Sequence, residues 1–293
     1  MYDIIIIGKG PAGISAAIYG VRANRKVLVI AKDFGWLAKT DKIENYYGFE
    51  NPISGMDLLT AGIKQAERLG VEFFDGEVVG IENYDGFKVK TLGAEFESKA
   101  VILATGMPRK KSQIKNLTDY EGRGVGYCAI CDAFFYRGKA VAVAGNADYA
   151  YEEASELLPF TKNLTIYTNG REYTGTAHTT DNFDENIKLD KRKIDHLEGE
   201  EKLERIVFDD GSFALTDGFF VAEGTAGAMD FAYKLGLEND GKTIKVAKNQ
   251  STNVPGFFAA GDCVGGILQI SVAVSEGATA GLSAIEFLKQ SEK

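Results

Sequence analysis

The stretch Ile4-Ile5-Ile6-Ile7-Gly8-Lys9-Gly10-Pro11-Ala12-Gly13 opens this chain of 293 residues and decides its fold. An apolar run leads into the glycine spacing G-x-G-x-x-G, a helix-forming segment follows, and Lys26–Ile30 supplies a second apolar strand. In such a strand–turn–helix–strand unit, Gly8 permits the tight turn, Gly10 lets a pyrophosphate approach the backbone, and Gly13 allows close packing of helix on strand. Strands on both sides favour a dinucleotide site over a glycine turn without a ligand.

The end of the second strand departs from the usual pattern. An acid normally follows this strand and binds the ribose hydroxyls. Here Ala31 and Lys32 follow Ile30, and Asp33 comes slightly later. The ribose contact is therefore expected from the backbone or from Asp33, and the pattern leaves both possibilities open.

A second unit of the same kind begins at Lys139. A strand over 140–144 is followed by the turn Gly145-Asn146-Ala147-Asp148-Tyr149-Ala150, a helix over 151–158 and a strand over 163–167. Its glycine fingerprint is incomplete, because alanine stands where the second glycine is expected. The predicted fold class is therefore α/β, with two Rossmann-like domains, of which the first has a complete fingerprint.

The composition excludes several classes of protein. Hydrophobic residues make up 45% and charged residues 26%, as in ordinary globular proteins, and the net charge is −9. An acidic chain lacks the basic surface that binds nucleic acid or an anionic membrane. No apolar run approaches the ~18 residues of a membrane span, and the N-terminus does not resemble a signal peptide. We expect a cytoplasmic protein without nucleic-acid or membrane partners.

The cysteines point to redox chemistry. There are three, and Cys128 and Cys131 have the spacing C-x-x-C. In a reducing compartment this spacing favours a redox pair or a metal site. Zinc normally takes four ligands, and only Cys263 and two scattered histidines remain, so we expect no metal. Cys263 itself is interpreted as a small buried side chain.

The chain resembles the low-molecular-weight thioredoxin reductases, which are flavoprotein disulfide reductases with two dinucleotide-binding domains. The resemblance extends over essentially the whole chain, and its most specific part is the pattern C-A-x-C-D-x-F-[FY] around the cysteine pair. The matching segments are Gly8–Gly13, Ile102–Gly106, Tyr127–Gly138 and Phe258–Asp262, together with Glu44–Phe49.

The resemblance implies a domain organisation. An FAD-binding domain of three layers (ββα) would be split between residues 1–115 and 244–293. A redox-cysteine domain with a degenerate NAD(P)H-type fold would be inserted as residues 116–243. The junctions near Asn116 and Thr243 would act as hinges, and two chains would form a homodimer through their FAD domains.

The resemblance also implies where FAD binds. The pyrophosphate would lie on Gly10–Gly13, Asp262 would bind the ribitol, and Asn45 and Gln269 would lie near the isoalloxazine. Trp36 stands in Phe34-Gly35-Trp36-Leu37, where the family usually has Gly-Gly-Gln. It would shield the flavin, occupy the space left by an absent nicotinamide, or simply pack in the protein. The expected FAD contacts are Gly8, Gly10, Pro11, Ala12, Gly13, Lys32, Gly35, Trp36, Leu37, Asn45, Val78, Ala104, Thr105, Gly106, Gly261, Asp262, Gln269 and Ile270.

By the same resemblance, Cys131 is the cysteine next to the flavin and Cys128 is the interchange cysteine. Reduced flavin would open the disulfide at Cys131, and the Cys128 thiolate would attack the disulfide of thioredoxin. Asp132 would donate a proton to the leaving thiolate. The alternative for Asp132 is a carboxylate that only stabilises the start of a helix.

The second turn argues against NADPH. Family members that use NADPH carry G-x-G-x-x-A at this turn and the run H-R-R-x-x-x-R after the next strand. Here Ala147 and Tyr149 occupy the turn, and Thr168-Asn169-Gly170-Arg171 replaces the arginine run that binds the 2′-phosphate. The pattern resembles the flavin-type ferredoxin–thioredoxin reductases, so we expect ferredoxin as the donor. Arg109-Lys110-Lys111 with Lys115 is either its docking patch or a solvated loop.

Two alternatives remain open. The first is a thioredoxin reductase that uses NADPH or NADH through an altered pocket, with NADH the less excluded of the two. The second belongs to another class, a flavin-binding redox sensor or scaffold without turnover. The intact segment Cys128-Ala129-Ile130-Cys131-Asp132 argues against the second alternative.

Overall fold

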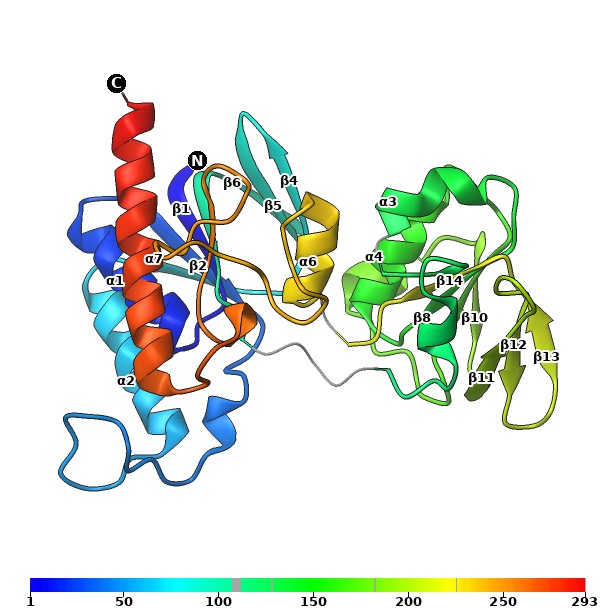
Figure 1. Cartoon of the computed structure of the whole chain (residues 1–293), viewed down its shortest axis with the longest axis horizontal. Coiled ribbons are helices and arrows are strands. Elements are labelled where there is room, and N and C mark those ends of the chain that lie inside the picture. Colours follow the sequence, from blue (N-terminus) through cyan, green and yellow to red (C-terminus); the bar gives the residue numbers. More distant parts are fainter. Residues whose placement is uncertain (107–111, 128, 182, 225, 293) are drawn as a thin grey trace. The chain divides into compact units, whose positions relative to one another are not determined.

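The computed structural model describes residues 1–106, 112–127, 129–181, 183–224 and 226–292. The chain divides into two compact units (Figure 1). Unit 1 combines Met1–Pro108 with Gly227–Lys293, and unit 2 is the segment between them, Arg109–Ala226. Among the described residues, no helix is both long and apolar enough to cross a membrane.

Unit 1 is built on a seven-stranded sheet with the order β3-β2-β1-β6-β5-β4, in which β15 also pairs with β6. β6 has two roles: its last residues pair in parallel with β1 and β15, and its first residues pair antiparallel with β5. The strands are β1 (Tyr2–Ile7), β2 (Val27–Ala31), β3 (Glu72–Asp75), β4 (Val78–Tyr84), β5 (Gly86–Thr91), β6 (Ala94–Leu103) and β15 (Phe257–Ala259).

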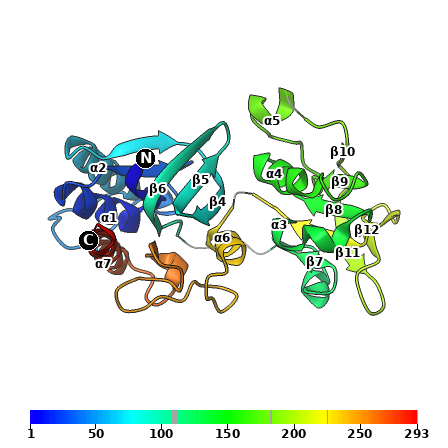
Figure 2. The ribbon, with the colours of Figure 1, turned by 90° about the horizontal axis from the view of Figure 1, so that it is seen from above.

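Helices cover one face of the parallel part of this sheet. α1 (Pro11–Arg22), α2 (Gly55–Arg68) and the long α7 (Ile270–Ser291) bury their small and aliphatic side chains against β1, β2 and β6. Figure 2 shows α1 and α2 on one side of the unit and the β4–β5 hairpin on the other. The carboxyl ends of β1 and β6 therefore meet the N-terminus of α1, where an α/β sheet commonly binds its ligand.

Unit 2 repeats this architecture with a contiguous segment. Its five-stranded parallel sheet has the order β10-β9-β8-β14-β7, and a three-stranded antiparallel sheet has the order β11-β12-β13. α3 (Ala129–Asp132) and α4 (Asp148–Leu157) pack on one face, and the three-stranded sheet packs on the other. The strands are β7 (Val125–Gly126), β8 (Val141–Ala144), β9 (Leu164–Tyr167), β10 (Ile187–Asp190), β11 (Ile194–Glu198), β12 (Arg205–Phe208), β13 (Phe213–Leu215) and β14 (Gly218–Val221). The predicted class, two Rossmann-like layered α/β domains, is confirmed.

The observed limits of the units differ from the expected ones. We expected the inserted domain to cover 116–243, whereas unit 2 ends at Ala226. The reason is α6 (Ala228–Leu235), which packs against β4 and so belongs to unit 1. The junction expected near Thr243 therefore lies within unit 1, and the change of unit occurs just before α6.

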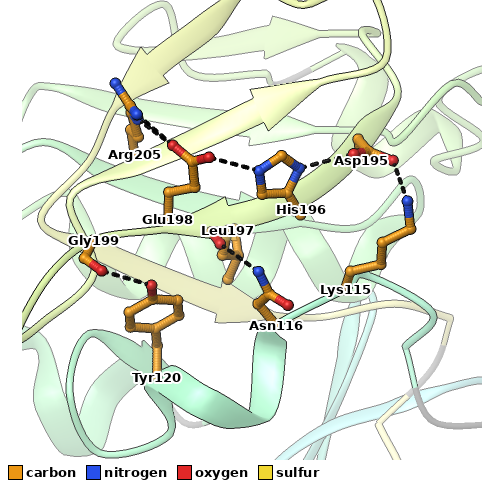
Figure 3. Close-up of polar contacts among 9 residues, drawn as sticks. All are labelled: Lys115, Asn116, Tyr120, Asp195, His196, Leu197, Glu198, Gly199 and Arg205. Atoms are coloured by element: carbon orange, nitrogen blue, oxygen red, sulfur yellow. Dashed lines mark hydrogen bonds and ion pairs between the residues drawn. The ribbon is translucent and has the colours of Figure 1, made fainter.

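The start of unit 2 is joined to β11 by a polar network (Figure 3). The Lys115 ammonium contacts Asp195 at 2.7 Å, and Asn116 donates to the carbonyl of Leu197. His196 lies between Asp195 and Glu198, at 2.8 Å from each, and these carboxylates raise its pKa. The segment that enters unit 2 is thus held on the edge of the three-stranded sheet.

Candidate functional site

A pocket of ≈ 270 Å³ opens in unit 1 where the first glycine turn meets the C-terminal part of the chain. It is formed by the start of α1, the end of β6, the segment 36–40, the loop after β15 and the start of α7. Its lining residues are Gly10, Pro11, Ala12, Trp36, Leu37, Thr40, Ala104, Gly106, Ala260, Gly261, Asp262, Leu268, Gln269, Ile270 and Ala273.

The three fingerprint glycines have different roles. Gly8 has a φ of +113°, and a Cβ there would lie 2.2 Å from the Ala104 oxygen. A Cβ on Gly13 would lie 1.9 Å from the Gly8 oxygen. Both glycines thus permit close packing and do not line the pocket. Gly10 does line it, and a Cβ there would meet no heavy atom within 4 Å. The open space required for a ligand therefore lies at Gly10.

The start of α1 is suited to an anion. Gly10 is the N-cap, Pro11 is the first helical residue, and the first turn contains no acidic residue. Within the described part of the chain, no side chain caps this helix end. Its N–H groups and its helix dipole therefore remain available to a phosphate. The hydroxyl of Thr105, two residues after β6, is buried and has no partner among the described residues, but Thr105 does not line the pocket.

Asp262 and Gln269 supply the polar side chains of the opposite wall. Burial raises the pKa of the Asp262 carboxyl. The Gln269 side chain accepts a hydrogen bond from the Asn45 amide at 2.9 Å, so Asn45 supports the wall without lining it. Together with the α1 turn, these groups fit FAD, which has an anionic pyrophosphate at one point and a polyhydroxyl chain at another.

Three residues that we expected to contact FAD lie outside the pocket. Lys32 follows β2 and forms an ion pair with Glu77 at 2.5 Å, and Val78 is buried next to Glu77 in the chain. Gly35 lies in an exposed turn. None of the three lines the pocket. Sequence reasoning missed the lining residues Thr40, Ala260, Leu268 and Ala273, which carry no charge pattern that could identify them.

The cysteine segment lies in unit 2. Cys128 is outside the described residues, and only the backbone of Cys131 is described, as part of α3. The N–H of Ala129, between the two cysteines, donates to the buried Glu153 carboxylate at 2.8 Å. Burial raises the pKa of Asp132, which suits a group that must hold and release a proton.

The second turn contrasts with the first. Asp148 stands in the first turn of α4 and is buried. Its carboxylate accepts hydrogen bonds from the Thr176 N–H at 2.8 Å and the Thr179 hydroxyl at 2.5 Å. An anion of the protein itself therefore already occupies the positive end of α4.

Other residues pack on the second glycine turn and cover it. The N–H of Thr174 donates to the Asn146 oxygen at 2.7 Å, so the segment after β9 lies on the turn. The Tyr149 ring does not project into a ligand space but is buried in the core with α3 and β14. Of the expected basic cluster, Arg109, Lys110 and Lys111 lie outside the described residues.

Comparisons with known proteins identify relatives over almost the whole chain. A family model described as pyridine nucleotide-disulphide oxidoreductase matches residues 2–277. The thioredoxin reductase of Aquifex aeolicus is 36% identical over 308 residues, which cover 100% of this chain and 95% of that protein. The thioredoxin reductase of Bacillus subtilis is 33% identical over 303 residues, with 99% and 96% covered.

Solved structures add two neighbours. The atypical thioredoxin reductase TRi from Desulfovibrio vulgaris Hildenborough is 43% identical, covers 99% of both chains and has a TM-score of 0.96. A ferredoxin-flavin thioredoxin reductase from Clostridium acetobutylicum is 32% identical, covers 100% of this chain and 99% of its own, and has a TM-score of 0.73.

The chain therefore belongs to the pyridine nucleotide-disulphide oxidoreductases, and within that class to the thioredoxin reductase family. Members of this family are FAD flavoproteins, so FAD is the cofactor.

Proposed function

We propose that this protein reduces the disulfide of thioredoxin through Cys128 and Cys131, and that reduced ferredoxin rather than NADPH supplies the electrons. The observation that carries the proposal is the contrast between two equivalent helix ends. Neither helix end has a side-chain cap among the described residues, but the first turn of α1 has no acid, whereas Asp148 stands in the first turn of α4. One end favours a phosphate and the other opposes it by charge.

The rest of the second turn supports the same reading. Ala147, the N-cap of α4, has an extended backbone and carries a Cβ where a pyrophosphate would approach. After β9, the Thr168 hydroxyl donates to the Arg171 oxygen at 2.5 Å. The Asn169 amide donates to the Glu223 carboxylate at 3.5 Å, so an acid lies near the turn where a 2′-phosphate would need cations.

A protein donor would reach unit 1 from its pocket rim. Trp36 and Leu268 line the pocket and remain 63% and 46% exposed. FAD accepts single electrons and passes two to a disulfide. Two reduced ferredoxins would therefore supply the two electrons, and two protons would convert one disulfide of thioredoxin into two thiols.

The cysteine pair would carry these electrons onward. Once reduced, the Cys128 thiolate attacks one sulfur of the thioredoxin disulfide and releases the other as a thiolate. Cys131 then attacks the mixed disulfide, which frees reduced thioredoxin and restores the disulfide between the two cysteines. Asp132, whose pKa burial raises, would protonate a leaving thiolate. By resemblance, we also expect a homodimer in the cytoplasm.

One observation favours a second candidate, an NAD(P)H-dependent enzyme with an altered pocket. A Cβ on Gly170 would lie 3.3 Å from the Cβ of Lys193, so the Lys193 stem runs along the turn, and Arg171 is exposed beside it. In this candidate, Lys193 and Arg171 would take the place of the missing arginines.

The test is anaerobic. The bleaching of the flavin absorption band is followed with reduced ferredoxin, with NADPH and with NADH, each in the presence of oxidised thioredoxin. Bleaching and thioredoxin reduction with ferredoxin alone support the proposal. Rapid bleaching by NADPH that is lost in Lys193→Met and Arg171→Ala supports the second candidate and refutes the first.

Trapping experiments separate both enzymes from a redox sensor. Cys131→Ser should accumulate a mixed disulfide between Cys128 and thioredoxin, and Cys128→Ser should not. Cys263→Ser is the matched control, because Cys263 is completely buried in unit 1 and its pKa is raised to about 12. A protein that reduces no thioredoxin with any donor would be the sensor.

A further inference from the structure

Glu276 reaches the flavin pocket from behind its wall. It belongs to α7, and its carboxylate accepts a hydrogen bond from the N–H of Gly261 at 2.8 Å. Gly261 and Asp262 line the pocket, whereas Glu276 does not. Burial raises the pKa of Glu276, the Gly261 N–H opposes that shift, and the nearby Asp262 adds to it. The carboxylate thus lies immediately behind the Gly-Asp loop.

A close helix crossing places Glu276 there. A Cβ on Gly277 would lie 2.0 Å from the Ala12 oxygen, so α7 touches the backbone of α1 at the residue next to Glu276. The Ser15 hydroxyl donates to the Val274 carbonyl at 2.8 Å and holds the same crossing. The first turn of α1, which forms one pocket wall, therefore sets the position of the group that supports the other wall.

Gly261 has a conformation that needs support. Its φ of +81° lies in the left-handed region, and the following residues, Asp262–Val264, form a short 3₁₀ helix. A Cβ on Gly261 would lie 3.0 Å from the Cβ of Ala12, so the loop packs closely on α1. The N–H that Glu276 accepts belongs to Gly261, the residue before Asp262, so this hydrogen bond restrains the backbone next to Asp262.

We propose that Glu276 is a positioning residue of the FAD site, whose carboxylate holds the Gly261 peptide so that Asp262 faces the bound cofactor. The inference rests on the proposed placement of FAD at this pocket. It extends the site to a residue that does not line the pocket and that belongs to none of the sequence motifs described above.

The test compares three substitutions at one position. Glu276→Met keeps most of the side-chain volume and a similar helix propensity but removes the acceptor. Glu276→Ala removes both volume and acceptor, and Glu276→Gln keeps an amide oxygen that can accept from Gly261. The control is Glu286→Gln on the exposed face of the same helix, which removes an equal charge. The readouts are the FAD dissociation constant of the flavin-free chain and its thermal melting.

We expect the Met and Gln variants to differ in their affinity for FAD. Glu276→Met should bind FAD about tenfold more weakly or worse, because a hydrogen bond to a charged group is lost. Glu276→Gln should stay within about threefold of the parent chain, as should Glu286→Gln. An unchanged affinity in Glu276→Met refutes the inference, and so does a loss in Glu276→Gln as large as in Glu276→Met. If neither the Met nor the Ala variant folds, a loss of FAD affinity greater than threefold in Glu276→Gln still refutes the inference.

Asp262→Ala separates this inference from the placement of FAD. If Asp262→Ala weakens FAD binding while Glu276→Met does not, the placement stands and the positioning role fails. If neither substitution weakens FAD binding, FAD is not held at this wall, and both ideas are refuted.

Discussion

The substitution Gly10→Ala tests where the pyrophosphate lies. Gly10 has φ −77° and ψ −177°, a conformation that alanine adopts freely, and its Cβ would meet no heavy atom within 4 Å. The flavin-free chain should therefore keep its stability to within about 1 kcal/mol. The added methyl group would instead project into the space in front of the uncapped end of α1.

The expected loss falls on FAD binding alone. Displacing a phosphate from the helix end costs one or two charge-assisted hydrogen bonds, each worth about 1.5–3 kcal/mol. A loss of about 3 kcal/mol corresponds to a roughly hundredfold weaker affinity. FAD is titrated into the flavin-free protein, and binding is followed by the fluorescence of the sole tryptophan, Trp36, which lines the pocket.

Gly13→Ala is the matched control in the same turn. Its Cβ would lie 1.9 Å from the Gly8 oxygen, so the backbone must shift. We expect the flavin-free chain to lose about 1–3 kcal/mol of stability in urea unfolding. If Gly10→Ala binds FAD within threefold of the parent chain, or destabilises the flavin-free chain as much as Gly13→Ala does, the reasoning about the open helix end is wrong.

Three further predictions concern the rest of the molecule. Asp148→Ala removes the buried carboxylate that accepts the Thr176 N–H, so hydrogen exchange of that amide should accelerate roughly a hundredfold. His196 has a raised pKa, so its ion pairs stabilise fully below about pH 6.5 and weaken as pH rises through the folded-state value; NMR titration should give a midpoint above 6.5. Gly277→Ala places a Cβ 2.0 Å from the Ala12 oxygen and should lower both stability and FAD affinity, measured by urea unfolding and FAD titration.

Each of these has its own check. Glu156→Ala removes an exposed acid from α4 and should leave the Thr176 amide protected, whereas equal exchange in both variants contradicts the role of Asp148. A His196 midpoint at or below 6.5 contradicts the network in Figure 3. Gly62→Ala on α2 meets only one side-chain atom, at 3.4 Å, so a loss as large as that of Gly277→Ala would refute the close-crossing argument.

The sequence predicted those features of the fold and the site that depend on residues adjacent in the chain. The fingerprint Gly8–Gly13 is contiguous, and its strand, turn and helix follow from local rules, so the first unit and its helix end could be predicted. The sequence showed Asp148 as part of the incomplete second glycine turn. It could not show that Asp148 accepts hydrogen bonds from Thr176 and Thr179, because these residues lie far along the chain.

The remaining differences also come from long-range packing. The pair Lys32–Glu77 and the hydrogen bond from Gly261 to Glu276 join residues on different elements, and no spacing rule connects them. The same holds for α6, whose sequence does not show that it packs on β4 rather than on the inserted unit. Contacts of this kind depend on how the helices and sheets pack in three dimensions, and that packing is difficult to predict from a single sequence.

The split of unit 1 has a consequence for how the protein is made. Unit 2 is contiguous and can fold as soon as it leaves the ribosome. Unit 1 cannot, because β15 and α7, the partners of β6 and α1, come from its last segment, Gly227–Lys293. The face of β1 and β6 that α7 covers stays open until the segment Gly227–Lys293 has been synthesised. Because the start of α7 also lines the pocket, we expect flavin binding to follow the synthesis of this segment, and a chain truncated before α7 to be colourless.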